Sequence, residues 1–249
     1  MSVHILLNGA SGRMGQAISS ICTDYDCEIS CPIDLGDDPT DGLIRCDVVI
    51  DFSLREATLP LAQKCADAGK PMVIGTTGHD PSEKEEILKV TSGIPVVWAG
   101  NFSTGVNLLF YLTEQAARVL DSSSNFDAEV VEMHHKLKKD APSGTADRLL
   151  EILKDSRGLS DENIAHGRSG LVGERPLDEI GSHALRGGDV VGDHTVYFAG
   201  IGERLELTHR ATDRKIFAAG ALRAAKWVMG RSPGLYSMQD VLGLVSSSK

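Results

Sequence analysis

The fold of the first half is decided by the stretch V-H-I-L-L-N-G-A-S-G-R-M-G, residues 3–15. An apolar strand leads here into a glycine-rich turn, and a helical pattern starts directly after the turn. Glycines permit the tight turn and let the backbone approach a pyrophosphate, which the amide groups of the helix start can bind. The spacing is G-x-x-G-x-x-G rather than G-x-G-x-x-G, so the motif alone is weak. Its position after the first strand nevertheless predicts a dinucleotide-binding turn.

Outward from this turn, short apolar runs alternate with helical patterns through the first hundred residues. Such alternation, with nearly continuous apolar strands, is typical of a parallel sheet covered by helices on both faces. We predict strands at Val3–Leu7, Glu28–Ile33, Val48–Asp51, Met72–Ile74 and Val96–Trp98, and helices at Met14–Cys22, Glu56–Ala68 and Ser82–Val90.

An acidic residue ends the second predicted strand. Asp34 follows Gly15 by 19 residues, where a dinucleotide-binding fold places an acid on the adenosine ribose hydroxyls. A solvated loop acid is the alternative. Leu35 and two further aspartates follow, and no arginine is there to receive a 2′-phosphate. We therefore expect NADH to be preferred and NADPH to remain possible, with Arg13 as the nearby cation that softens the preference.

Two further loops follow later strands, at the edge where ligands of such sheets gather. They are Gly75-Thr76-Thr77-Gly78 and Ala99-Gly100-Asn101-Phe102. Small residues and free backbone amides suit an uncharged carboxamide ring. For either loop alone, turn formation without ligand binding is the better explanation.

The pattern changes after Asn101 and predicts an α+β second domain, with one sheet face left over for another contact. We place a dinucleotide-binding domain at residues 1–105, completed by 215–249, and a substrate-binding and oligomerisation domain at 106–214. The predicted elements are helices at Gly105–Leu120, about Thr145–Lys154 and Ile216–Met229, strands at Phe126–Met133, Thr195–Ala199 and Arg204–Ala211, a turn at Ile201-Gly202 and a loose tail at Ser246–Lys249.

Composition restricts the classes of partner. The formal net charge of −10 would repel nucleic acid. No apolar run approaches the ~20 residues that cross a bilayer, and the first residues lack a signal-peptide pattern, so we expect a cytoplasmic protein without membrane contact. The five cysteines fit no common zinc module. We expect buried, reduced thiols and no metal.

The most specific stretch is E-M-H-H-K-L-K-K-D-A-P-S-G-T-A, residues 132–146. It gathers two imidazoles and ammonium groups just beyond a strand, and a Ser-Gly-Thr helix start follows that can hold a carboxylate. A histidine pair by itself is usually exposed without a function or forms hydrogen bonds in the core. A lysine run by itself usually belongs to a solvent-exposed surface. Pro142 and the capping hydroxyls make this a shaped polar loop, which more often carries function.

This stretch closely resembles the dihydrodipicolinate reductase family, whose signature H-H-x-x-K-x-D-A-P-S-G-T is present in every fixed position. The resemblance covers essentially the whole chain, with modest departures at Leu35, His79 and Gly100. It also rests on Gly9–Gly15, Gly75–Gly78, Asn101–Asn107, Arg186–Val196 and His209–Arg214.

The resemblance implies a reductase of the diaminopimelate route to lysine. In that reaction, hydride passes from a nicotinamide to C4 of an unsaturated ring, and the resulting enamine takes a proton at C3. His134 matches the family's proton donor, and imidazole suits that role because its usual pKa lies near working pH. Lys138 matches a residue assigned to proton donation or carboxylate binding.

The remaining site residues are also carried over from the family. The residues expected to bind a small dicarboxylate substrate are His135, Ser143, Gly144, Thr145 and Arg214. The residues expected to bind the cofactor are Gly9, Ala10, Ser11, Gly12, Arg13, Met14, Asp34, Gly75, Thr76, Thr77, Ala99, Gly100, Asn101 and Phe102.

The family further implies a homotetramer, formed through the sheet of the second domain. Bringing hydride donor and acceptor together implies domain closure, with hinges near Asn101–Gly105 and Arg214. Two alternatives are another nicotinamide-dependent dehydrogenase on the same architecture and a non-catalytic redox sensor that binds dinucleotide. Neither explains the stretch Asp140–Thr145.

Overall fold

The computed structural model describes residues 2–244. The chain divides into unit 1, Met1–Thr104 with Arg214–Lys249, and unit 2, Gly105–Asp213. Each boundary falls one residue earlier than the sequence suggested. The predicted tail at Ser246–Lys249 lies outside the described residues. Among the described residues, no helix combines the length and apolarity that a membrane span requires.

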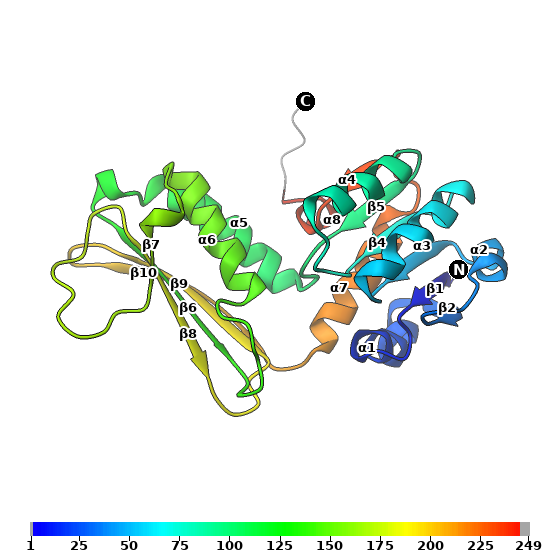
Figure 1. Cartoon of the computed structure of the whole chain (residues 1–249), viewed down its shortest axis with the longest axis horizontal. Helices are drawn as coiled ribbons and strands as arrows, with labels where there is room; N and C mark the ends of the chain where they lie inside the picture. Colours follow the sequence, from blue (N-terminus) through cyan, green and yellow to red (C-terminus); the bar gives the residue numbers. More distant parts are fainter. Residues whose placement is uncertain (1, 245–249) are drawn as a thin grey trace. The chain divides into compact units, whose positions relative to one another are not determined.

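Unit 1 is built on a parallel sheet (Figure 1). In the described part of the chain its strands run in the order β11-β5-β4-β3-β1-β2. The order reverses direction at β1, because β2 lies on one side of it and β3 on the other. The strands are β1 (Val3–Asn8), β2 (Cys27–Ile33), β3 (Val48–Asp51), β4 (Met72–Ile74), β5 (Pro95–Trp98) and β11 (Gly234–Tyr236).

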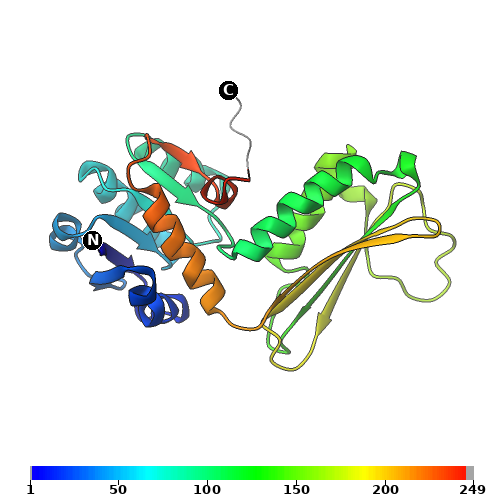
Figure 2. The ribbon, with the colours of Figure 1, turned by 180° about the vertical axis from the view of Figure 1, so that it is seen from behind.

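Helices cover both faces of this sheet, as Figure 2 shows from behind. One apolar cluster joins the sheet to α1, α7 and α8, and a second joins it to α2, α3 and α4. Gly220 allows α7 to pack closely, because a Cβ there would lie inside contact distance of the Phe102 carbonyl. The helices are α1 (Arg13–Ile21), α2 (Thr40–Arg45), α3 (Arg55–Asp67), α4 (Pro81–Val90), α7 (Lys215–Val228) and α8 (Met238–Leu242).

The carboxyl ends of the central strands are tied together by one buried carboxylate. Asp51, at the end of β3, is fully buried. It accepts hydrogen bonds from the side chains of Asn8 (2.9 Å), Thr58 (2.8 Å) and Thr76 (3.0 Å). Asn8 ends β1 and Thr76 follows β4. Asp51 therefore fixes the bases of the loops that follow three neighbouring strands.

Unit 2 holds a mixed sheet in the order β10-β9-β6-β8-β7. Strand β6 is antiparallel to β9 and parallel to β8. Helices α5 and α6 pack on one face through a single apolar cluster, while buried and partly exposed residues alternate along β6 and β9. The elements are α5 (Thr104–Val119), β6 (Asp127–His134), α6 (Gly144–Arg157), β7 (Ile164–His166), β8 (Ile180–Arg186), β9 (Gly192–Ala199) and β10 (Arg204–Ala211).

The predicted fold class, a Rossmann-like parallel sheet followed by an α+β domain, is confirmed. Helix and strand bounds differ from the predicted ones by at most three residues. The largest differences are at β9, which begins three residues before Thr195, and at α6, which ends three residues after Lys154. Four of the cysteines are buried, and Cys31 is partly buried. The sequence pattern did not predict α2, β7, β8, β11 or α8.

Candidate active site

The glycine-rich turn of unit 1 is shaped by close backbone contacts. Gly9 has φ +83°, and a Cβ there would lie 2.4 Å from the carbonyl oxygen of Phe52. A Cβ at Gly15 would lie 2.2 Å from the carbonyl oxygen of Gly9. Side chains at these two positions would close the turn, so the local sequence fits a backbone cradle for a pyrophosphate at the start of α1. Ala10, Ser11, Gly12 and Arg13 form the rest of the turn, and Met14 packs against the core.

Asp34 lies beside this turn. Both of its carboxylate oxygens accept from the backbone amide of Ser11, at 3.2 Å. The amides of Gly9 and Ala10 donate to the carbonyl of Ile33. A shallow hollow next to it is lined by Asp34, Leu35 and residues of α3, and 70% of the Leu35 side chain is exposed. Asp34 and the glycine-rich turn are therefore adjacent. A bound adenosine ribose and its neighbouring pyrophosphate would require this arrangement.

The two later loops line a second hollow of about 330 Å³ in unit 1. Thr76, Thr77 and Gly78 come from the loop after β4, and Ala99 and Gly100 come from the loop after β5. Some predicted ligands face inward instead: the Thr76 hydroxyl is bound to Asp51, and the Phe102 ring is buried 5.4 Å from the ring of Phe52. In Asn101 the side-chain oxygen accepts from the amide of Ser103. The Phe102 ring is therefore part of the core and does not face this hollow.

In unit 2 the site is built at the carboxyl end of β6. The alternation along this strand places Glu132 and His134 on the face covered by helices, where they are 1% and 8% exposed. His134 Nδ1 lies 2.5 Å from Glu132 Oε2. The ring of His194 on β9 lies 5.1 Å from the His134 ring. A buried carboxylate thus holds an imidazole at the carboxyl end of β6.

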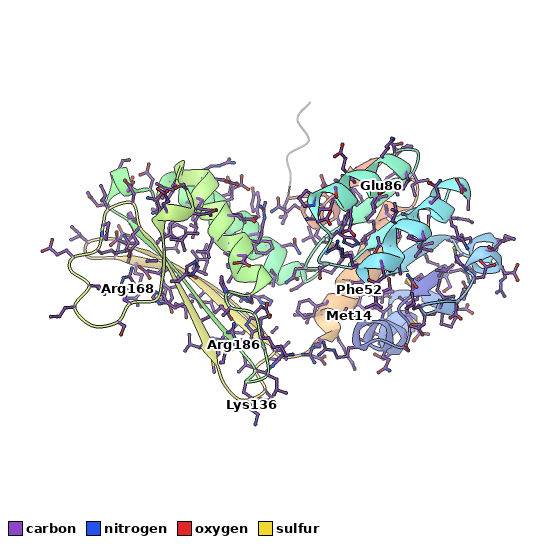
Figure 3. All side chains as sticks on the ribbon, in the orientation of Figure 1. Met14, Phe52, Glu86, Lys136, Arg168 and Arg186 are labelled. Atoms are coloured by element: carbon purple, nitrogen blue, oxygen red, sulfur yellow. The ribbon has the colours of Figure 1, made fainter. Side chains whose placement is uncertain are left out.

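Arg186 completes this cluster from β8. Its guanidinium donates to both oxygens of Glu132, at 2.9 and 2.8 Å. It also donates to the carbonyl of Asp140, at 2.7 Å. The amide of Lys136 donates to the carbonyl of Gly188, at 3.2 Å. Figure 3 labels Lys136 and Arg186 at this end of unit 2. The basic loop is therefore anchored to β8 and to the turn after it.

The start of α6 adjoins the same carboxylate. Ser143 is the N-cap residue, and its hydroxyl accepts from the amide of Ala146 at 3.2 Å. The Ser143 amide donates to Glu132 Oε1 at 3.2 Å, and the hydroxyl lies 3.1 Å from His194 Nε2. Gly144 is exposed, and a Cβ there would meet nothing within 4 Å. Thr145 follows it on the first turn, so the helix start predicted to hold a carboxylate lies beside His134.

The other residues predicted for catalysis and substrate binding are Lys138, His135 and Arg214. Lys138 is partly buried and pairs with Asp140 at 2.8 Å. Among the described residues, Nδ1 of His135 is buried without a hydrogen-bond partner. Arg214 precedes α7 and belongs to unit 1, whereas the other predicted substrate residues belong to unit 2.

The electrostatics of the cluster favour one ionised carboxylate among neutral imidazoles. Burial raises the pKa of Glu132, but the hydrogen bonds from Arg186 and His134 outweigh it, so that this pKa is lowered. Burial lowers the pKa of His134, and Glu132 opposes that effect. Burial lowers the pKa of His194 to about 4. His194 is therefore neutral near pH 7, while His134 keeps a counter-ion for its protonated form.

The structure brings His134, Lys138, Ser143, Gly144 and Thr145 to one end of unit 2 and the predicted cofactor residues to one edge of the sheet of unit 1. The sequence pattern indicated no role for Glu132, Arg186 or His194. The signal for Glu132 was available, because an alternating strand that ends in His134 places Glu132 on the buried side, and a buried carboxylate requires partners. Arg186 carried no such signal, since β8 was not identified.

Comparisons with known proteins cover both units. A family model described as "Dihydrodipicolinate reductase, N-terminus" matches residues 3–102, and one described as "Dihydrodipicolinate reductase, C-terminus" matches residues 105–242. The chain is 53% identical to the 4-hydroxy-tetrahydrodipicolinate reductase of Akkermansia muciniphila, covering 97% of this chain and 98% of that protein. It is 46% identical to the Thiobacillus denitrificans protein of the same name, covering 98% and 100%.

A solved structure supports the fold. The dipicolinate-bound dihydrodipicolinate reductase of Paenisporosarcina sp. TG-14 superposes with a TM-score of 0.76, at 23% identity, over 96% of this chain and 99% of that one. The match spans both units of the present chain.

Proposed function

We propose, from the premise that this chain belongs to the dihydrodipicolinate reductase family, that it reduces 4-hydroxy-tetrahydrodipicolinate. The 4-hydroxyl group leaves as water to give dihydrodipicolinate, and reduction of that compound gives tetrahydrodipicolinate of the diaminopimelate route to lysine. The protein is an NAD(P)H-dependent oxidoreductase. The observation that carries the reaction is the buried imidazole of His134 beside the start of α6, because it pairs a proton donor with a carboxylate site.

The residues of unit 2 supply the proton and hold the substrate. When bound, a reduced nicotinamide supplies the hydride for C4 of the ring. Reduction there leaves an enamine, and His134 donates the proton that C3 then takes up. Lys138 assists this proton transfer. The residues that bind the two substrate carboxylates are His135, Ser143, Gly144 and Thr145, and Arg214 adds a cation. The rival functions, another dehydrogenase or a redox sensor, give these residues no task.

One assay tests this reaction: loss of NADH absorbance with the product of dihydrodipicolinate synthase as substrate. We expect His134→Gln and Lys138→Ala each to lower kcat by roughly 10²-fold or more, the usual scale for acid–base groups. Lys139→Ala, an exposed neighbour in the same loop, is the matched control and keeps kcat within about twofold. Near-normal kcat in both site variants would overturn the assigned roles.

The cofactor turn of unit 1 supports a preference for NADH. Asp34 lies beside the turn, Leu35 is exposed where a cation for a 2′-phosphate would be needed, and further carboxylates follow. Like charges disfavour the phosphate, and a difference of 1.4 kcal/mol already gives a tenfold preference. We expect kcat/KM to be about tenfold higher with NADH, and a higher value with NADPH would contradict this.

We also propose a homotetramer in the cytoplasm. The sheet face of unit 2 opposite α5 and α6 carries partly exposed residues of β6 and β9, and such a face suits contact with a second copy. Light scattering measures the mass directly, and a monomer would refute the assembly.

A further inference from the structure

Glu132 has its hydrogen-bonding capacity filled inside unit 2. Its side chain is 1% exposed and accepts two bonds from Arg186, one from the Ser143 amide and one from His134 Nδ1. An unpaired buried carboxylate is costly, whereas a bidentate guanidinium compensates the charge. Arg186 therefore keeps Glu132 ionised, and an ionised carboxylate only accepts hydrogen bonds.

This arrangement determines which nitrogen of His134 carries hydrogen. Because Glu132 Oε2 accepts at 2.5 Å, Nδ1 must hold a proton in both charge states of the ring. The second nitrogen, Nε2, lies over Gly192, where a Cβ would be 2.9 Å away. Nε2 is thus the ring atom left to exchange a proton with a substrate.

We infer that Glu132, held by Arg186, is the positioning residue that fixes His134 as its Nδ1–H tautomer and stabilises its protonated form, so that Nε2 delivers the proton. This inference rests on the proposed function for the identity of the proton acceptor. Glu132 does not touch substrate in this scheme and acts through the imidazole.

The charges around His134 determine the direction of the effect. On β6 the facing group is Glu132, on β8 it is Arg186, on β9 it is His194, and in the basic loop it is Lys138 with its partner Asp140. Burial lowers the pKa of His134, Lys138 and Arg186 lower it further, and among these groups Glu132 raises it. Removing the charge of Glu132 therefore lowers the pKa of His134 more. The protonated ring is then lost at a lower pH than in the wild type.

The first test observes the ring directly and needs no substrate. Long-range ¹H–¹⁵N correlation spectra of the histidine side chains, with His134→Gln for assignment, report tautomer and midpoint. We expect Nδ1–H in the wild type and, in Glu132→Gln, a mixture of tautomers with a midpoint lower by about one pH unit or more. An Nε2–H tautomer in the wild-type spectrum would overturn the inference even if the variant does not fold.

The second test uses the pH profile of kcat/KM. Donation requires protonated His134, so activity is lost as pH rises through its pKa. We expect Glu132→Gln to move this alkaline limb to lower pH by about one unit and to lower kcat about 10- to 100-fold, with KM little changed. Glu132→Asp should restore part of the limb position.

The matched control is Glu129→Gln, the same substitution on the same strand but on its other face. It should leave the tautomer and the alkaline limb unchanged. If Glu132→Gln lowers activity without moving limb or tautomer, its role is only structural and the inference fails. A wild type that shows the expected tautomer but no reductase activity would instead refute the proposed function.

Discussion

Gly192 leaves room for the imidazole of His134. A Cβ placed on it would lie 2.9 Å from Nε2 and 3.3 Å from Cδ2 of that ring, and 3.5 Å from Cε1 of His194. Real Cβ atoms essentially never approach to 2.9 Å, so a methyl group must displace the ring. The backbone itself accepts alanine, because the φ angle of Gly192 is not positive. Because residue 192 carries a hydrogen atom in place of a methyl group, the imidazole of His134 can pack against its Cα.

Gly192→Ala should therefore lower kcat about 10- to 100-fold, since displacements of about 1 Å at a reacting group cost that much. The melting temperature should change by a few degrees at most, because the new group meets a side chain rather than backbone. Gly93→Ala is the control: a Cβ there meets nothing within 4 Å. Steady-state kinetics and calorimetry on both variants measure the two effects. A wild-type kcat in Gly192→Ala would show that the alanine methyl group does not displace the His134 ring.

At the scale of elements, the sequence predicted the strands and helices that have a clear local pattern. The strands β1 and β3 to β5 are apolar runs with clear turns, and α7 is a continuous alanine-rich helix. Strand β8 gave no pattern because long-range contacts determine its residues. Gly181 interrupts it, since a Cβ there would collide with the carboxylate of Glu129. The loop residues of the site came from the family resemblance, whereas Arg186 required the strand register.

Glu129 joins β6 to β8 and to the segment between β7 and β8. Its carboxylate accepts from Arg168 at 2.7 Å, from Arg175 at 3.2 Å and from His183 at 2.7 Å. Burial raises its pKa, but these three donors outweigh burial and lower the pKa from 4.5 to about 2. A lowered folded-state pKa means that the stabilisation is complete above about pH 4.5 and is lost as the pH falls towards about 2.

Glu129→Gln should thus lower the free energy of unfolding by up to about 3 kcal/mol near neutral pH and by much less near pH 3. Urea unfolding followed by circular dichroism at both pH values measures the difference from wild type. Glu114→Gln removes an exposed ion pair on α5 of the same unit and should change stability by less than about 1 kcal/mol at either pH. A pH-independent effect of Glu129→Gln would exclude the ionised carboxylate as the source of the stability.

At the scale of the whole molecule, the two units have separate cores. One of the two apolar clusters of unit 1 draws on both of its segments, because α7 from the second segment packs on the sheet formed mainly by the first. The other cluster lies within the first segment. The apolar cluster of unit 2 consists of residues 106–198. Because each core is built within its own unit, each unit should open with its own free energy. The proposed cofactor residues belong to unit 1, and the proposed catalytic residues belong to unit 2.

Ligands should therefore protect the units selectively. NADH at 100 times its Kd adds about 2.7 kcal/mol to the stability of the folded state that binds it. Amides that exchange through opening of unit 1 should therefore exchange about 10²-fold more slowly. Amides of β6 and β9 should exchange at their former rate. Pyridine-2,6-dicarboxylate, as a substrate-like dianion, should give the reverse pattern, with protection centred on β6 and the start of α6. Hydrogen exchange followed by mass spectrometry resolves the two units by peptide. Equal protection of both units by NADH alone would mean that the chain opens as one cooperative body, so that occupancy of the cofactor turn already stabilises the catalytic strand before any substrate arrives.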